Sequence, residues 1–259
     1  MSLNLKTSTY SYIVLIVAVI LLILLFSGVI ALGGGEKIVI KKPEGEGTIF
    51  VDSVEKKSFS NPNKDIVLKN IEPGLHSILI SRVGYWPWFK EVLVVEKEVK
   101  TLTPFFVLEN SSGLIVTEED PEYQTIVSKI SSVVPASFAD KKISQDGKVG
   151  IWVDGGSLFA EWLGDEKELP SYYCNDFGCH TVVVPLGVTV DIRNLDFYKD
   201  RNDVIIASFG TGIFAIEADT TGNQNFQPIF EGESPNYILA EDGNSIYVLS
   251  NETLLQVAI

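Results

Sequence analysis

The stretch "DRNDVIIASFGTGIFAIEAD", Asp200–Asp219, decides the fold class of this chain. A polar turn leads into the apolar run "VIIASF", the pair Gly210 and Gly212 supplies a second turn, and another apolar run follows. Short apolar runs separated by turn residues are typical of antiparallel β-strands joined in a hairpin.

Two other stretches have the same layout, "DGKVGIWVDGGSLFAEWL" from Asp146 and "EDGNSIYVLSNETLLQVAI" from Glu241. Between equivalent positions, Ile151 to Val204 spans 53 residues and Val204 to Ile246 spans 42. A period of about 40–50 residues with several strands per unit is typical of propeller blades. We therefore expect residues 133–259 to form a propeller-like antiparallel β domain of about three blade-like units.

The segment "IRNLDFYKDRNDVIIASFGTGIFAIEADTTGNQNFQPIF", Ile192–Phe230, resembles one blade of the WD-repeat-like β-propellers. The resemblance covers residues 133–259 but departs from that class in number, because three units, the last one short, fall below the ~4–8 blades of a closed propeller. The region is then an open arc, a sandwich built from the same hairpins, or a fragment that a partner closes.

Residues 37–109 have the alternating pattern of a small antiparallel β-sandwich. Short apolar runs are separated by turn residues such as Pro73 and Gly74. Positive φ at Gly74 would allow a turn there, and Gly84 would let a strand end sharply. The expected strands contain Ile38 and Ile40, Ile49 and Val51, Ile66–Leu68, His76–Ile80, Lys90–Val95 and Thr101–Leu108.

Two motifs in this region resemble the PEGA domain. "PEGEGTIFVD", Pro43–Asp52, is similar to that family's opening Pro-Glu-Gly-Ala followed by a strand, with Glu46 where alanine is usual. "LKNIEPGLHSILISRVGY", Leu68–Tyr85, is similar to its later signature, although "SVEKKSFSN" replaces the usual glycine-rich turn. The resemblance implies a β-sandwich of envelope and surface proteins, commonly a non-catalytic accessory module, and it carries over no catalytic residue.

Residues 110–132 are expected to be a linker with one short helix. Asp120 can cap that helix with Pro121 at its first position. An apolar face at helical spacing follows, and it should lie against one of the β domains or between them. The residues of this face are Tyr123, Ile126, Val127 and Ile130.

Residues 12–32, "YIVLIVAVILLILLFSGVIAL", contain no charged side chain. As a helix rising ~1.5 Å per residue they would span about 31 Å, the hydrocarbon thickness of a bilayer. We expect a single-pass transmembrane helix between an N-terminal tail, 1–11, and a glycine-rich linker, 33–36. A signal peptide cleaved after Ala31 is the alternative, although the apolar run is longer than a usual signal of ~7–15 residues.

The expected orientation of this helix depends more on the length of the region that follows it than on the charges beside it. Lys6 precedes it, whereas Lys37, Lys41 and Lys42 follow it, which weakly favours the opposite orientation. Long downstream domains cross a membrane largely regardless of nearby charge. We therefore expect a cell-membrane protein whose C-terminal domains are extracytoplasmic.

The charge of the chain excludes one class of partner. Its formal net charge is −14, and because only Lys6 precedes Glu36, the region beyond residue 35 has 34 acids and 19 bases, a net of −15. The electrostatic field of so negative a region repels phosphate backbones, so we expect no nucleic acid partner.

The only two cysteines, Cys174 and Cys179, flank the turn-like sequence "NDFG". A structural zinc site needs four ligands, and beyond His180 and Asp176 the neighbourhood offers none. A redox pair needs Cys-x-x-Cys, which is not present. We expect a disulfide, which an oxidising compartment permits, with free buried thiols and a metal site as the alternatives.

The candidate binding residues are the aromatic cluster Tyr85, Trp86, Trp88 and Phe89. Trp and Tyr favour sites that are apolar at one end and wet at the other, so an exposed cluster would suit a glycan, a partner or the bilayer interface. The alternative is that these side chains pack between domains or cap the end of the sandwich.

No motif for a nucleophile, phosphate loop, dinucleotide site or metalloprotease occurs, so we expect neither catalysis, nor a cofactor, nor a bound metal. Asp196, Asp200 and Asp203 are close in sequence and are expected to be a solvated turn. The sequence favours a membrane-anchored envelope module that binds a protein or a cell-wall glycan. The alternatives are a scaffold whose incomplete repeats are completed by another subunit, including a homo-oligomer, and a membrane-bound hydrolase.

Overall fold

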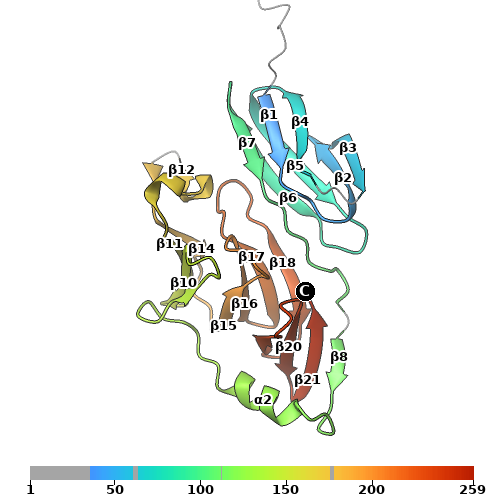
Figure 1. The fold of residues 1–259 in the computed structure, drawn as a ribbon, viewed down its shortest axis with the longest axis vertical. Helices are drawn as coiled ribbons and strands as arrows, with labels where there is room; N and C mark the ends of the chain where they lie inside the picture. The colour runs from blue at the N-terminus through green and yellow to red at the C-terminus, as the bar shows by residue number, and fades with distance from the viewer. Residues whose placement is uncertain (1–35, 61–63, 112, 176–177) are drawn as a thin grey trace, which may run out of the picture.

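The computed structural model describes residues 36–60, 64–111, 113–175 and 178–259, and it confirms a mainly β protein built from antiparallel sheets (Figure 1). Its described residues hold one α-helix, α2 (Tyr123–Ser131). The predicted membrane segment, 12–32, lies outside the described residues. Within the described part of the chain, no helix is both long enough and apolar enough to cross a bilayer.

The N-terminal region, residues 36–102, consists of two sheets that share one core. A three-stranded sheet has the order β4-β1-β7, and a four-stranded sheet has the order β3-β2-β5-β6. The strand pair β1 and β7 is parallel, and the other pairs of this region are antiparallel. The strands are β1 (Glu36–Ile40), β2 (Glu46–Val51), β3 (Val54–Ser60), β4 (Ile66–Ile71), β5 (Gly74–Ser81), β6 (Trp88–Val94) and β7 (Val99–Leu102).

Alternation of side chains along these strands builds the core of the N-terminal region. Ile38 and Ile40 of β1 and Ile78 and Ile80 of β5 have no exposed surface, because every second residue of a strand faces the opposite sheet. Gly74 has a positive φ of 144° at the start of β5, so a β-branched residue would be strained at this turn.

The predicted strand Thr101–Leu108 is wrong after Leu102. Strand β7 ends at Leu102, and the chain continues as a connector, residues 103–111, whose one β-bridge to the N-terminal region joins Tyr85 and Leu108. Pro104 has no N–H to donate to a ladder. The run Pro104–Val107 is buried without alternation, because both β regions contact it.

The C-terminal region, residues 113–259, contains three four-stranded antiparallel sheets, here named sheets I, II and III. Sheet I has the order β14-β11-β10-β9, sheet II the order β15-β16-β17-β18 and sheet III the order β19-β20-β21-β8. Their strands are β9 (Lys142–Ile143), β10 (Val149–Asp154), β11 (Ser157–Trp162), β14 (Val182–Leu186), β15 (Ile192–Phe197), β16 (Val204–Phe209), β17 (Gly212–Glu217), β18 (Phe226–Glu231), β19 (Asn236–Leu239), β20 (Ser245–Ser250), β21 (Thr253–Ala258) and β8 (Gly113–Val116).

Sheet II lies between the other two, and its sequence explains why. In β16, Val204 and Ile206 belong to the core shared with sheet III, while Ile205 and Ala207 belong to the core shared with sheet I. All four side chains have no exposed surface. A strand covered on both faces needs a continuous apolar run, and "VIIA" supplies it.

The three predicted hairpins occupy equivalent places in the three sheets. Ile151 lies in β10, Val204 in β16 and Ile246 in β20. These are the second strands of sheets I, II and III when each sheet is counted from the edge strand β9, β15 or β19. The sheets stand side by side in an arc, which the described residues do not close into a ring (Figure 1).

Strand β8 corrects the prediction that residues 110–132 are a linker with only a helix. Its backbone pairs with β21, so that Val116 lies opposite Leu254 and Ile115 opposite Leu255. The third repeat looks short in sequence because its fourth strand comes from a segment about 140 residues earlier in the chain.

Helix α2 follows β8 and covers the outer face of sheet III. The predicted apolar face is correct: Ile126 and Ile130 are 6% and 1% exposed and pack with Leu254 and Val116. The predicted cap is wrong, since the helix begins after Glu122, whose side chain makes no capping hydrogen bond. Asp120 instead accepts hydrogen bonds from the backbone N–H and the hydroxyl of Thr117, at 2.7 and 3.0 Å.

Cys174 and Cys179 form a disulfide in the structure. It joins the small strands β12 (Cys174–Asn175) and β13 (Gly178–Cys179), which are inserted between β11 and β14 of sheet I, after the short 3-10 helices η1 (Glu166–Glu168) and η2 (Ser171–Tyr173). His180 is exposed next to this pair.

Candidate ligand-binding pocket at the junction of the two regions

The predicted aromatic cluster lies at the junction between the N- and C-terminal regions. Trp88 is 1% exposed and belongs to the core, so its side chain does not reach the surface. Tyr85 and Trp86 are partly buried against the same core, and the backbone N–H of Trp86 donates to the carbonyl of Val107 at 2.9 Å. Phe89 is also partly buried. These residues form a joint between the regions instead of a free platform.

A polar network on the inner side of the junction ties β6 to sheet II. The backbone N–H of Phe89 donates to Asn225 Oδ1 at 2.9 Å, and Lys90 Nζ lies 3.0 Å from Glu217 Oε2 and 3.1 Å from Asp219 Oδ2. Asn225 Nδ2 donates to Glu217 Oε2 at 2.9 Å. Lys90 and Glu217 are nearly inaccessible, with 2% and 6% of their side chains exposed.

The buried position of Glu217 changes the pKa of its carboxyl group. Burial raises its pKa, while the charge of Lys90 and the hydrogen bond from Asn225 lower it in part. A buried ion pair is costly to break from one side, because the remaining charge keeps no partner. The pair therefore fixes how the two regions meet.

A second set of contacts clamps the connector onto the turn between β15 and β16. Arg201 donates from Nη1 to the carbonyl of Pro104 and from Nη2 to that of Thr103, both at 2.7 Å. Its Nε and Nη2 also bind Asp203, at 2.8 and 2.6 Å. The fork of one guanidinium thus holds two segments about a hundred residues apart in the sequence.

Tyr198 completes the clamp. Its hydroxyl donates to the carbonyl of Phe106 at 3.0 Å, and its ring is 2% exposed. Burial raises the pKa of Tyr198, so the hydroxyl keeps its proton and remains a donor.

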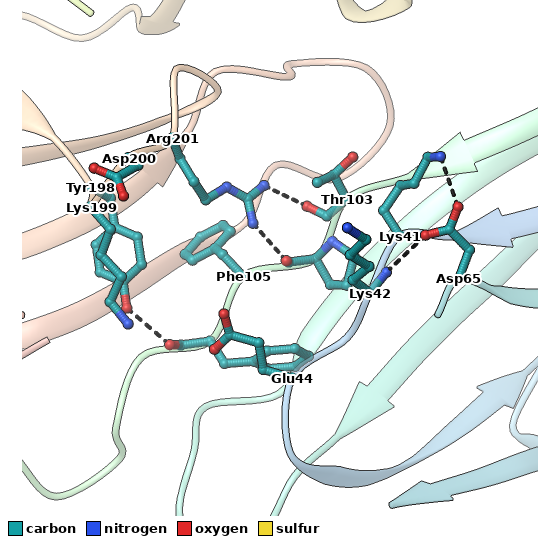
Figure 2. Close-up of a pocket in the computed structure, with 12 residues that line it drawn as sticks. Lys41, Lys42, Glu44, Asp65, Thr103, Phe105, Tyr198, Lys199, Asp200 and Arg201 are labelled. Carbon is teal, nitrogen blue, oxygen red and sulfur yellow. Dashed lines mark hydrogen bonds and ion pairs between the residues drawn. The ribbon is translucent and has the colours of Figure 1, made fainter. Parts of the chain in front are cut away.

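A cavity of about 550 Å³ opens beside this clamp (Figure 2). Its volume is in the range of small-ligand sites, ~300–1,000 Å³. The N-terminal region, the connector and the β15–β16 turn each supply part of the wall, so the cavity exists only where the two regions meet. The lining residues are Lys41, Lys42, Glu44, Asp65, Thr103, Pro104, Phe105, Phe106, Tyr198, Lys199, Asp200 and Arg201.

Four cationic side chains line the cavity, and two of them are already paired. Lys41 Nζ lies 2.8 Å from Asp65 Oδ2, and this hydrogen bond holds the pKa of Asp65 below its usual value. Arg201 is neutralised by Asp203. Within the described residues neither Lys42 nor Lys199 forms an ion pair, and the ammonium of Lys199 lies 5.2 Å from the Tyr198 ring centroid.

Two lysine ammoniums are therefore free to bind a ligand, in a body whose net charge is strongly negative. Glu44 and Asp200 add carboxylates at the rim, and the buried rings of Phe105 and Phe106 lie in the wall. Such a lining offers donors and acceptors to a polar ligand. It shows no nucleophile with an adjacent base of the kind that covalent catalysis needs.

The remaining predicted groups lie apart from one another. Asp196 pairs with Lys142 and Asp203 with Arg201, whereas Asp200 lines the cavity. His76 is a partly buried side chain between Asp52 and the Glu72 carbonyl, each at 2.7 Å. In the described part of the chain, no group of three or more His, Cys, Asp and Glu side chains gathers as a metal site would require.

The sequence did not point to this cavity. Its walls come from residues 41–44, from the connector and from residues 198–201, and no spacing rule joins segments so far apart.

Comparison with known proteins adds no identification. No protein-family model matches the chain, and no curated protein matches it either. The resemblances to the PEGA domain and to propeller blades therefore remain predictions that rest on the quoted motifs.

Proposed function

We propose that this protein is a membrane-anchored, extracytoplasmic envelope protein that binds a protein or a cell-wall glycan without catalysing a reaction. Residues 12–32 would hold it in the membrane, a PEGA-like sandwich would follow, and three blade-like sheets would form the outer part. The observation that carries the proposal is the junction cavity, because a binding site needs a preformed concave surface and a rigid frame.

The frame is rigid for a physical reason. The Lys90–Glu217 pair and the Arg201 clamp fix the junction at two places, and apolar contacts between them run from Trp88 to Tyr198. A wall built from two regions keeps its shape only if those regions do not move relative to each other. The ligand would then meet Lys42 and Lys199 in fixed positions.

Recovery of a ligand from intact envelope fractions tests the proposal. The full chain should retain an envelope component that the double variant Lys42→Glu/Lys199→Glu loses, because reversing both free charges makes the rim repel what it attracted. The matched control is Lys57→Glu/Lys69→Glu, two exposed lysines outside the cavity. Equal recovery by all three proteins would show that the cavity is not the binding site, and no recovery by the unaltered chain would refute the binding function.

The location is tested separately by labelling thiols in intact cells. Cys174 and Cys179 are disulfide-bonded, so a membrane-impermeant maleimide should label them only after an added reductant. Labelling that requires cell lysis would place the C-terminal region on the cytoplasmic side and overturn the proposed location.

A second candidate function is a scaffold whose three sheets are completed by another subunit. One observation favours it: the sheets form an open arc (Figure 1), and sheet I, at one end of that arc, exposes Ile143 and Val184, at 49% and 41%.

A further inference from the structure

One end of the N-terminal region, named here the proximal end, is where strand β1 begins. The register brings three strands together at this end, because Lys37 of β1 lies opposite Lys69 of β4 and opposite Val99 of β7. The β4–β5 turn, residues 72–73, and the β6–β7 turn, residues 95–98, therefore belong to the proximal end as well.

Four exposed apolar side chains lie at the proximal end. Leu75 of β5 and Leu93 of β6 are directly opposite each other and are 65% and 55% exposed. Val95 follows Leu93 by two residues, and Val99 lies just beyond the β6–β7 turn; they are 47% and 54% exposed. Single exposed apolar residues are normal, but an opposed pair of leucines with two valines beside it forms a patch, and such patches mark contacts with a membrane or a protein.

The predicted membrane segment ends close to this patch in the sequence. From Leu32, the last residue of that segment, to Glu36, the first residue of β1, there are four residue steps, which cover at most about 14 Å. The headgroup layer on each side of a bilayer is roughly 5–7 Å deep. If residues 12–32 span the bilayer, the start of β1 is therefore held within about two headgroup layers of the hydrocarbon.

The distribution of charge favours the same arrangement. Residues 36–102 contain 10 acids and 11 bases, a net of +1, whereas residues 103–259 contain 24 acids and 8 bases, a net of −16. Anionic headgroups repel the second part of the chain but not the first. The N-terminal region is thus the part that can approach a lipid surface without a large electrostatic cost.

The proximal end itself is close to neutral. Its bases are Lys37, Lys69 and Lys97, and its acids are Glu36, Glu72, Glu96 and Glu98. Within the described residues, neither Lys37 nor Lys69 forms an ion pair, although like charges directly opposite each other on a sheet are unfavourable. Their ammoniums can reach lipid phosphates on long apolar stems while the leucines lie deeper.

We infer that the proximal end rests on the bilayer surface, with Leu75 and Leu93 at the level of the headgroups. The inference rests on the proposed membrane anchor and adds to it a second contact, made by the folded N-terminal region. This contact would orient the whole protein. Residues 41–42, which line the junction cavity, follow the other end of β1 after ~13 Å of strand, so the cavity lies on the side away from the lipid (Figure 1).

Fluorescent probes on single cysteines of the full-length chain test the inference. Leu75→Cys and Leu93→Cys, labelled with nitrobenzoxadiazole and reconstituted into phosphatidylcholine vesicles, should be quenched by lipids that carry a nitroxide just below the headgroup. Val83→Cys is the matched control, because Val83 is 99% exposed in the β5–β6 turn, at the other end of the same sandwich. Quenching should be roughly threefold stronger at Leu75 and Leu93 than at Val83. Cys174 and Cys179 are disulfide-bonded and should take no label without reductant.

Flotation of the same vesicles separates the contact from the anchor. A chain that floats with the vesicles but is quenched no more at Leu75 and Leu93 than at Val83 keeps its anchor and overturns the inference. A chain that does not float with the vesicles refutes the proposed anchor, and the inference falls with it.

Removal of the two leucines completes the test. In the double variant Leu75→Ser/Leu93→Ser, a probe at Val95→Cys should lose about two thirds of its quenching, because the apolar surface that holds the proximal end on the lipid is gone. Both leucines are exposed, so the fold should survive, and flotation should not change. Val83→Ser is the control and should leave the Val95 probe quenched. Unchanged quenching in the double variant would overturn the inference.

Discussion

The two ends of the C-terminal region differ in how their outer sheet faces are treated. Sheet III is covered by helix α2, with Ile130 1% exposed, whereas sheet I ends in a face where Phe138 is 64% exposed. Both faces are made of apolar side chains on four-stranded sheets. The difference teaches that an open row of sheets needs a separate element to end it, and that the described part of the chain supplies a helix for this at a single end.

The largest effect is expected at the covered end. Ile130→Ala removes a buried side chain between α2 and sheet III, and such changes lower the free energy of unfolding by about 2–5 kcal/mol. Denaturant unfolding of the full chain in detergent would measure it. Lys129→Ala, an exposed neighbour on the same helix, is the control and should change the value by less than about 0.5 kcal/mol. Equal effects would mean that α2 does not seal sheet III.

At the open end, the largest expected effect comes from the disulfide. Replacing Cys174 and Cys179 together by serine should lower the free energy of unfolding by about 2–3 kcal/mol, because the bond limits the freedom of the unfolded chain around a short loop. Unfolding of the double variant with and without reductant would measure this loss. A variant that matches the reduced unaltered chain supports the assignment, and a variant as stable as the oxidised chain contradicts it.

Sheet II, between the two ends, should respond to pH through Glu217. Its folded pKa is raised, so its contribution to stability is complete below the unfolded pKa and is lost as the pH rises through the folded value. Glu217→Gln removes this titration, so the stability of the unaltered chain relative to the variant should increase as the pH falls from 8 to 4. Glu231→Gln, exposed on the same sheet, should leave the profile unchanged. A pH-independent difference would contradict the raised pKa.

The smallest effect on folding is expected at Phe138. Phe138→Ala should lower the free energy of unfolding by less than about 1 kcal/mol, since the side chain is mostly exposed and meets Trp152 in a T-shaped contact. Thermal unfolding of the isolated chain would measure it. A loss as large as that of Ile130→Ala would mean that the two ends are equally well packed, and the comparison would fail.

Local patterns in the sequence predicted the strands and failed where partners are distant. The hairpins around Ile151, Val204 and Ile246 follow from short apolar runs and turn residues within about twenty positions. Strand β8 has four residues, and its partner β21 lies near the other end of the chain, so no local pattern could reveal it. The face of α2 was predictable from helical spacing, but the sheet that it covers was not.

The candidate site shows the same limit. The cluster from Tyr85 to Phe89 was recognisable as aromatic, but its composition does not tell whether Trp88 is exposed or forms a joint. Lys42 and Lys199 line one cavity only because Arg201 and Tyr198 hold the connector against the β15–β16 turn. Such a site depends on the packing of two regions, which a reading of one segment at a time does not contain.

Pairing of β8 with β21 has a consequence for how the polypeptide matures. The first strand of the C-terminal region cannot find its neighbour until residues 253–258 have been made, so a chain emerging from a ribosome or a translocation channel holds β8 and α2 without their docking surface. Closing so long a loop is slow. Loss of β21 would leave β8, at the beginning of the region, without its partner strand.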